Sequence, residues 1–149
     1  NLKKINLKHG PEPLLKSFTF KLFSNMLRAK KRNIKALLLD QSFLSGLGNI
    51  YVDESLWASN IHPKSISNSI SSKHIKILHF NIITILKEAI LNKGTTIIDF
   101  SVNGESGNYS QNLKIFGRSG NPCMKCKNEI IKIKVSGRGT YICTECQKI

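Results

Sequence analysis

CMKC at residues 123–126 and CTEC at residues 143–146 contain all four cysteines of this 149-residue chain: Cys123, Cys126, Cys143 and Cys146. Two thiolates three residues apart in a tight turn can bind one ion, and a hairpin between the pairs brings the second two alongside. We therefore expect one structural Zn²⁺ held by the four cysteines. Its binding free energy, of order 10 kcal/mol or more, would fold a segment that has little apolar core of its own.

Redox dithiols and iron–sulfur clusters are the alternatives for such a cysteine pattern. A catalytic zinc is not expected, because four protein ligands leave no open position on the metal. Paired CxxC motifs without further cysteines also fit a reducing compartment better than a disulfide scaffold.

The charge balance predicts a polyanionic partner. Lys and Arg number 23 against 9 acidic residues, which gives a formal net charge of +14. A zinc site with four thiolates would contribute about −2. A solvated basic surface is the alternative, whereas a membrane surface is less expected because no Lys-rich amphipathic helix or membrane-spanning apolar run stands out. No signal peptide is visible, and the start at Asn1 leads us to expect a piece of a longer or processed chain.

Helical signals fill most of the chain before the cysteines. Residues 1–13 are expected to form a linker that ends in two prolines. Ser17 is expected to cap a helix that runs to about Ala29, and Asn33 to cap a short helix through Leu38. A third helix is expected over residues 50–58.

The longest helix is expected over residues 73–92 and is ended by Gly94. Its apolar positions recur with a helical period at Ile75, Leu78, Ile82, Leu86 and Ile90. Residues 101–112 are rich in Gly, Asn and Ser and predict a mobile loop. Short strands are expected over 114–116, 130–135 and 140–142. The predicted fold is mainly α with a small β zinc finger, that is, a four-helix unit followed by a zinc-held β-hairpin.

Two further places suggest phosphate contacts. Arg138 lies between two glycines in the predicted hairpin, where a guanidinium can bind a phosphate; an ordinary exposed turn residue is the alternative. Gly48 and Asn49 open a helix whose N–H groups can bind an anion, although from these residues alone a plain turn and cap is the better explanation. Lys35 ends a basic cluster that also contains Arg28, Lys30, Lys31 and Arg32. The cluster could face the same partner or form a solvated surface. Asp53 is interpreted with Glu54 as a structural pair that stabilises the first helical turn.

These motifs together resemble the formamidopyrimidine-DNA glycosylases. The segments KALLLDQ (35–41), GLGNIYVDE (46–54) and IHP (61–63) are similar to the helix–two-turn–helix domain of that family, and GTT (94–96) and FGR (116–118) also match. So does the position of Arg138, five residues before Cys143. The resemblance implies a linker over 1–13, a helix–two-turn–helix DNA-binding domain over 14–112 with a lesion-capping loop at 101–112, and a zinc finger over 113–149.

The resemblance also implies a function in base-excision repair. The family members are glycosylases and AP lyases that flip oxidised purines, such as 8-oxoguanine and formamidopyrimidines, out of duplex DNA. By this likeness Asn49 and Arg138 would bind phosphates, Lys35 would lie near the lesion pocket, and Gly48 and Tyr51 would contribute to DNA binding. The expected partner is therefore double-stranded DNA with oxidised purine or abasic lesions. A monomer is expected in the bacterial cytoplasm, at the nucleoid, or in a DNA-containing organelle.

The family's N-terminal half, with its proline nucleophile, is absent from these residues. We therefore expect the chain as given to bind damaged duplex DNA without excising bases, and we assign no catalytic residue. A zinc-containing basic RNA-binding or ribosome-associated module is the alternative from another class. The related endonucleases for oxidised pyrimidines are the alternative within the superfamily.

Overall fold

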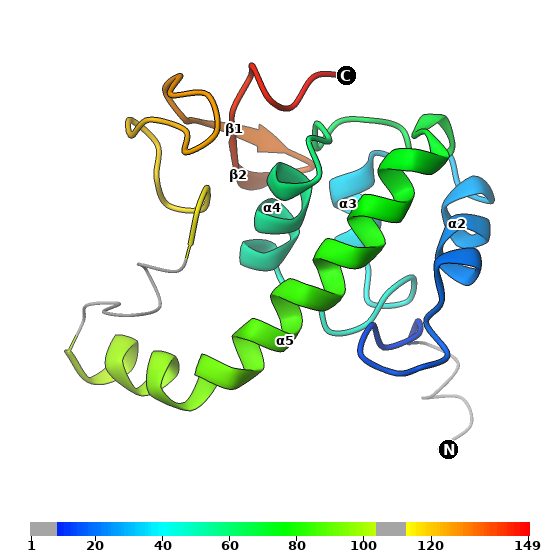
Figure 1. Ribbon diagram of the computed structural model, residues 1–149, viewed down its shortest axis with the longest axis horizontal. Helices are drawn as coiled ribbons and strands as arrows, with labels where there is room; N and C mark the ends of the chain where they lie inside the picture. The colour runs from blue at the N-terminus through cyan, green and yellow to red at the C-terminus, as the bar shows by residue number, and fades with distance from the viewer. Residues whose placement is uncertain (1–8, 104–112) are drawn as a thin grey trace.

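The computed structural model describes residues 9–103 and 113–149, and over 92–103 it describes the course of the backbone only. Its elements, in chain order, are α2 (Phe20–Arg28), α3 (Ile34–Leu39), α4 (Asn49–Ala58), the 3₁₀ helix η1 (Ser67–Ser69), α5 (Ser72–Asn103), β1 (Ile131–Val135) and β2 (Arg138–Ile142). In Figure 1 the hairpin of β1 and β2 lies beside α4, and α2 lies at the other end of the molecule. The predicted four-helix unit followed by a small β-hairpin is confirmed.

The N-terminal caps of α2 and α3 show where side-chain acceptors decide helix boundaries. Thr19, and not Ser17, caps α2, because its hydroxyl accepts the N–H of Leu22 at 3.1 Å. The prediction for α3 is confirmed: the side chain of Asn33 accepts the N–H of Ala36 at 2.9 Å. Each cap satisfies one of the N–H groups that the first helical turn leaves unpaired.

Helix α5 is longer than predicted, since it continues through Gly94 to Asn103. Glycine keeps both backbone hydrogen-bonding groups and weakens a helix interior by only about 1 kcal/mol relative to alanine, so it does not have to end one. Ile90 is 54% exposed and lies outside the core, unlike the four apolar positions before it. Most of the predicted loop at 101–112 lies outside the described residues. Among the described helices, none is long and apolar enough to span a membrane.

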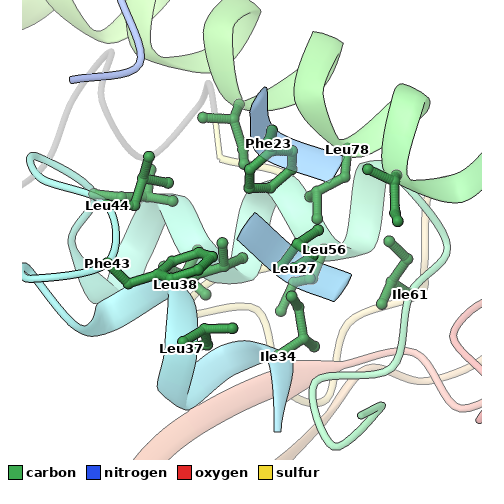
Figure 2. Close-up of a cluster of buried hydrophobic side chains, with 14 of the residues drawn as sticks. Phe23, Leu27, Ile34, Leu37, Leu38, Phe43, Leu44, Leu56, Ile61 and Leu78 are labelled. Atoms are coloured by element: carbon green, nitrogen blue, oxygen red, sulfur yellow. The ribbon is translucent and has the colours of Figure 1, made fainter. Parts of the chain in front are cut away.

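The helical part has one continuous apolar core. Figure 2 shows side chains from α2, α3, α4 and α5 converging, with Phe23, Leu27 and Leu56 near the centre. The buried members are Phe18, Phe23, Leu27, Ile34, Leu37, Leu38, Phe43, Leu44, Leu47, Val52, Leu56, Ile61, Ile70, Ile75, Leu78, Ile82 and Leu86. Burial of this apolar surface is the main force that holds these helices together.

Helix α4 is buried on all sides because it separates this core from the zinc finger. Six consecutive residues, from Val52 to Trp57, are buried. Trp57 belongs to a second and smaller apolar cluster with Ile115, Ile130 and two of the cysteines, Cys123 and Cys143. The polar side chains of α4 therefore have to find partners inside the protein.

The strand predicted over 114–116 is wrong. The backbone bends there, and the N–H groups of Lys114, Ile115 and Phe116 all point to the carboxylate of Glu54 at 2.8–3.1 Å. A bend that directs three consecutive N–H groups to one anion cannot also form a ladder with another strand. The carboxylate thereby fixes the chain just before the first cysteine pair.

Candidate nucleic-acid interface

The loop before α4 is built so that the helix begins without a side-chain cap. Gly46 has a φ of +92°, a conformation that glycine adopts most readily. Gln41 holds the loop, because its Oε1 accepts the N–H of Gly46 at 2.8 Å. Gly48 is the N-cap and has no side chain to offer, and Asn49 is the first helical residue rather than the cap. Gly48 therefore supplies no side-chain acceptor to the N–H groups of the first turn, as in helix termini that bind anions.

The hairpin turn presents Arg138 to solvent. β1 and β2 are antiparallel, and Val135 pairs with Arg138 next to the turn. Ser136 and Gly137 have φ values of 53° and 78°, as type I′ turns require. Arg138 is the first residue of β2 rather than part of the turn, and its side chain is exposed. The guanidinium thus stands near the tip of a short, twisted ribbon.

The start of α4 and the start of β2 meet. Nδ2 of Asn49 donates to the carbonyl oxygen of Gly139 at 3.4 Å, next to Arg138. Oδ1 of Asn49 is buried and has no hydrogen-bond partner among the residues that the structure describes. Nδ2 of Asn33, the cap of α3, reaches Oγ of Ser136 in the turn at 3.2 Å. Of the two predicted phosphate ligands, Asn49 therefore bonds to the residue that directly follows Arg138 in the chain.

Lys35 is not on this surface, contrary to the prediction. Its side chain is 0% exposed, and Nζ lies 2.8 Å from Oδ1 of Asp53, which is also fully buried. Burial is the main reason that the pKa of Lys35 falls below 10.5 and the pKa of Asp53 rises above 3.8, and the bond between the two groups opposes both shifts. The sequence places Lys35 in a basic run, but the inward-facing side of the short α3 buries it.

The rest of the predicted basic cluster is only partly available to a ligand. The guanidinium of Arg28 donates to the carbonyl oxygens of Asn68 and Ile70 at 3.2 and 2.7 Å. Arg32 pairs with Asp40 at 3.0 Å. Hydrogen bonds from Ser42 and Arg32 lower the pKa of Asp40 to about 2. Lys30 and Lys31 are exposed, so the run is part structural and part solvated.

Tyr51 lies on another side of α4 and is half-buried. It packs against the helical core and lines a cavity of about 760 Å³ between α4 and α5. Glu54, Trp57 and Lys114 line the same cavity. A DNA contact of Tyr51 stays a prediction.

The four cysteines gather at one point, and their Sγ atoms all lie within 4.8 Å of one another. Sγ of Cys123 lies 3.8 Å from Sγ of Cys146, and Sγ of Cys126 lies 3.4 Å from Sγ of Cys143. A tetrahedral site with Zn–S bonds of about 2.3 Å has sulfur atoms about 3.8 Å apart, whereas a disulfide bond needs about 2.05 Å. The cluster fits one structural zinc.

Trp57 and Lys125 join the zinc site to α4. Nε1 of Trp57 donates to Sγ of Cys123 at 3.4 Å. Nζ of Lys125 lies 4.2 Å from the centre of the Trp57 ring and donates to the carbonyl oxygen of Trp57 at 2.6 Å. Such partners around the ligands fix their orientation. Trp57 belongs to none of the motifs in the sequence, and Lys125 is one of the two residues between the cysteines of CMKC, where nothing marks it as a partner of α4.

Asp53 and Glu54 are structural, as predicted, but for a different reason. They lie past the first turn of α4 and bind the zinc-finger part instead of the helix end: Oδ2 of Asp53 accepts the N–H of Tyr141 at 3.0 Å. Gln147, another residue that sequence reasoning missed, is 1% exposed and joins Cys143 to Ile61. For Asp53 and Glu54, the signal in the sequence was two adjacent carboxylates within a predicted helix whose other residues are mostly apolar.

Two family models match the chain. One is the formamidopyrimidine-DNA glycosylase H2TH domain, over residues 9–101, and the other is a zinc finger found in FPG and IleRS, over residues 120–149. Among curated proteins, the formamidopyrimidine-DNA glycosylase of Protochlamydia amoebophila is 46% identical over 144 residues, which cover 93% of this chain and 52% of that protein. The Lactobacillus helveticus protein of the same name is 47% identical over 143 residues, which cover 95% of this chain and 52% of that protein.

Solved structures give the same result. A Lactococcus lactis formamidopyrimidine-DNA glycosylase, non-covalently bound to DNA that contains an AP site, is 41% identical with a TM-score of 0.85, and the match covers 99% of this chain and 53% of that one. A complex of the Lactococcus lactis protein with DNA that contains FAPY-dG is 42% identical with a TM-score of 0.87, with coverage of 99% and 54%. The chain spans about half the length of the curated relatives it matches.

Proposed function

The chain belongs to the formamidopyrimidine-DNA glycosylase family, and from that premise we propose that it is the part of a base-excision-repair enzyme that grips the sugar-phosphate backbone of damaged duplex DNA. The lesions in this proposal are oxidised purines and abasic sites. The protein acts as a monomer, in a bacterial cytoplasm at the nucleoid or in a DNA-containing organelle. Residues 14–112 act as the helix–two-turn–helix part and residues 113–149 as the zinc finger.

The observation that carries the proposal is the hydrogen bond between Asn49 and Gly139. It joins the N-terminus of α4, which has no side-chain cap, to the residue beside Arg138, and thereby brings an amide, a helix N-terminus and a guanidinium to one region of the protein. These are three groups that bind phosphate oxygens. The net charge of +14 adds a long-range attraction for a polyanion.

The DNA complexes of the relatives support the choice of ligand. The two Lactococcus lactis structures hold DNA with an AP site or with FAPY-dG, and their folds match this chain closely. The chemistry of the family, base excision and strand cleavage, needs the N-terminal proline nucleophile that the resemblance implies. We assign the 149 residues a role in binding and propose no catalytic group among them.

A salt titration of duplex binding tests the proposal. Neutralising about 3–5 phosphates is expected to give a slope of about −3 to −4.5 in a plot of log affinity against log salt concentration. The measurement uses a duplex with a central abasic-site analogue, and a structured RNA of the same length serves as the competitor. A slope near zero, or tighter binding to the RNA, would reject the proposal.

Replacing Arg138 by Ala is expected to weaken duplex binding about 10- to 100-fold, because a charge-assisted contact to phosphate is lost. The loss should be similar for duplexes of unrelated sequence, since phosphate contacts carry no base information. Lys21→Ala is the matched control, because Lys21 is an exposed cation on α2 and its loss changes net charge equally. Equal losses in the two variants would show that Arg138 has no special role.

A further inference from the structure

The ammonium group of Lys35 has no hydrogen left for a ligand. It donates to Oδ1 of Asp53 at 2.8 Å, to Oγ1 of Thr140 at 2.7 Å and to the carbonyl oxygen of Gly139 at 3.2 Å. An ammonium group has three donors, and all three are occupied inside the protein. Lys35 therefore cannot bind a phosphate directly without breaking one of these bonds.

Asp53 completes the contact between this pair and β2. While Oδ1 binds Lys35, Oδ2 accepts the N–H of Tyr141 at 3.0 Å. The pair thus supplies a donor to the carbonyl oxygen of Gly139 and an acceptor to the N–H of Tyr141, two residues further along. A neighbouring strand offers donors and acceptors to a sheet edge with the same two-residue repeat.

This arrangement compensates for a weakness of the hairpin. Within the described ranges, β2 pairs with β1 on one side and with no strand on the other, and an isolated two-stranded hairpin is marginally stable in water. The ion pair takes the position of a third strand along the three residues that follow Arg138. Thr140 adds a further link, because its hydroxyl also donates to the carbonyl oxygen of Arg138 at 3.0 Å.

We propose that Lys35 is a positioning residue for DNA binding: with Asp53 it holds the outer edge of β2, so that Arg138 stays beside Asn49 and both can grip one phosphate backbone. The inference rests on the proposed function, because it assumes that Arg138 and Asn49 bind DNA. It assigns Lys35 no contact with the lesion or with phosphate. The ion pair instead couples the helical part to the zinc finger at the point where both meet the ligand.

A double-mutant cycle with Lys35→Met and Arg138→Ala tests the inference on the zinc-loaded 149-residue chain. Lys35→Met alone is expected to weaken binding of the abasic-site duplex at least tenfold. In the Arg138→Ala background the same substitution should cost less than threefold, because the group that it positions is already gone. If the two factors multiply, Lys35 affects DNA binding independently of Arg138 and the inference is wrong. Lys21→Met serves as the charge-matched control.

A second measurement separates positioning from general loss of structure. Lys35→Met should speed hydrogen exchange at the amide of Tyr141, while amides of α2 and the zinc content keep their wild-type values. A variant that combines Lys35→Met with Asp53→Leu leaves no lone buried charge and keeps the test possible if the single variant does not fold. It should show the same loss of DNA affinity, and unchanged affinity would overturn the inference.

The failures of the two proposals can be told apart. If Arg138→Ala weakens binding and Lys35→Met does not, the positioning role is wrong and the proposed function stands. If Arg138→Ala has no effect, the proposed function fails, and the inference fails with it.

Discussion

Removing zinc is expected to unfold residues 113–149 and to reduce duplex affinity more than tenfold. The apolar cluster of this segment is small, and two of its five buried members are the zinc ligands Cys123 and Cys143. Metal binding of order 10 kcal/mol is therefore most of its folding free energy. Without the metal, the hairpin that carries Arg138 has no fixed place beside α4.

Chelation followed by fluorescence and circular dichroism checks this prediction. Trp57 is the only tryptophan and is 4% exposed beside Cys123, so its emission should shift to longer wavelength as the site opens. The helical signal should remain, because the main core contains no cysteine. Cys126→Ser should behave like the chelated protein, and Met124→Ser, in the same turn, should not. Full DNA affinity after chelation would contradict the prediction.

Replacing Glu54 by Ala is expected to lower the free energy of unfolding by about 3–5 kcal/mol. Glu54 is 6% exposed and accepts the N–H groups of Lys114, Ile115 and Phe116. Each hydrogen bond to a charged group contributes about 1.5–3 kcal/mol, and buried N–H groups left without an acceptor add a penalty. The expected loss is smaller than the sum of the three hydrogen-bond contributions, because the bend at residues 114–116 can partly relax in the variant.

Chemical denaturation of the zinc-loaded protein measures this loss, and hydrogen exchange at the amides of Lys114, Ile115 and Phe116 locates it. Glu129→Ala is the matched control, because it removes the same charge from an exposed position in the zinc finger. The control should stay within about 0.5 kcal/mol of the wild type. If Glu54→Ala changed the free energy of unfolding as little as this control, the carboxylate of Glu54 would not be what holds residues 114–116.

Local patterns predicted well wherever one residue and its chain neighbours set the outcome. The CxxC spacing predicted the cysteine cluster, because short turns place both sulfurs of a pair at one point. Asn33 was predicted as a cap, because a cap binds its own helix. The prediction that Gly94 ends the long helix was wrong. Where a helix ends depends on the residues beyond the glycine as well as on glycine's weakness as a helix former.

The DNA contacts of the candidate site stay predictions. Asn49 and Arg138 came from motifs 89 positions apart, and the structure joins Asn49 to Gly139, the residue after Arg138. Lys35 came from a basic run, and the structure buries it against Asp53. Charge in a sequence says nothing about which side of a short helix faces inward, so only packing could separate Lys35 from Lys30 and Lys31.

From its amino acids this chain had to be a helical unit with a zinc-bound finger, because periodicity and ligand spacing are properties of short segments. How the zinc finger docks on α4 could not be predicted from such segments and is decided only by the tertiary structure. It depends on Asp53 and Glu54, two carboxylates that look ordinary in the sequence and become essential once both faces of α4 are buried. A buried charge must find its partner across the fold, and such partners lie 18 to 88 residues away along the chain.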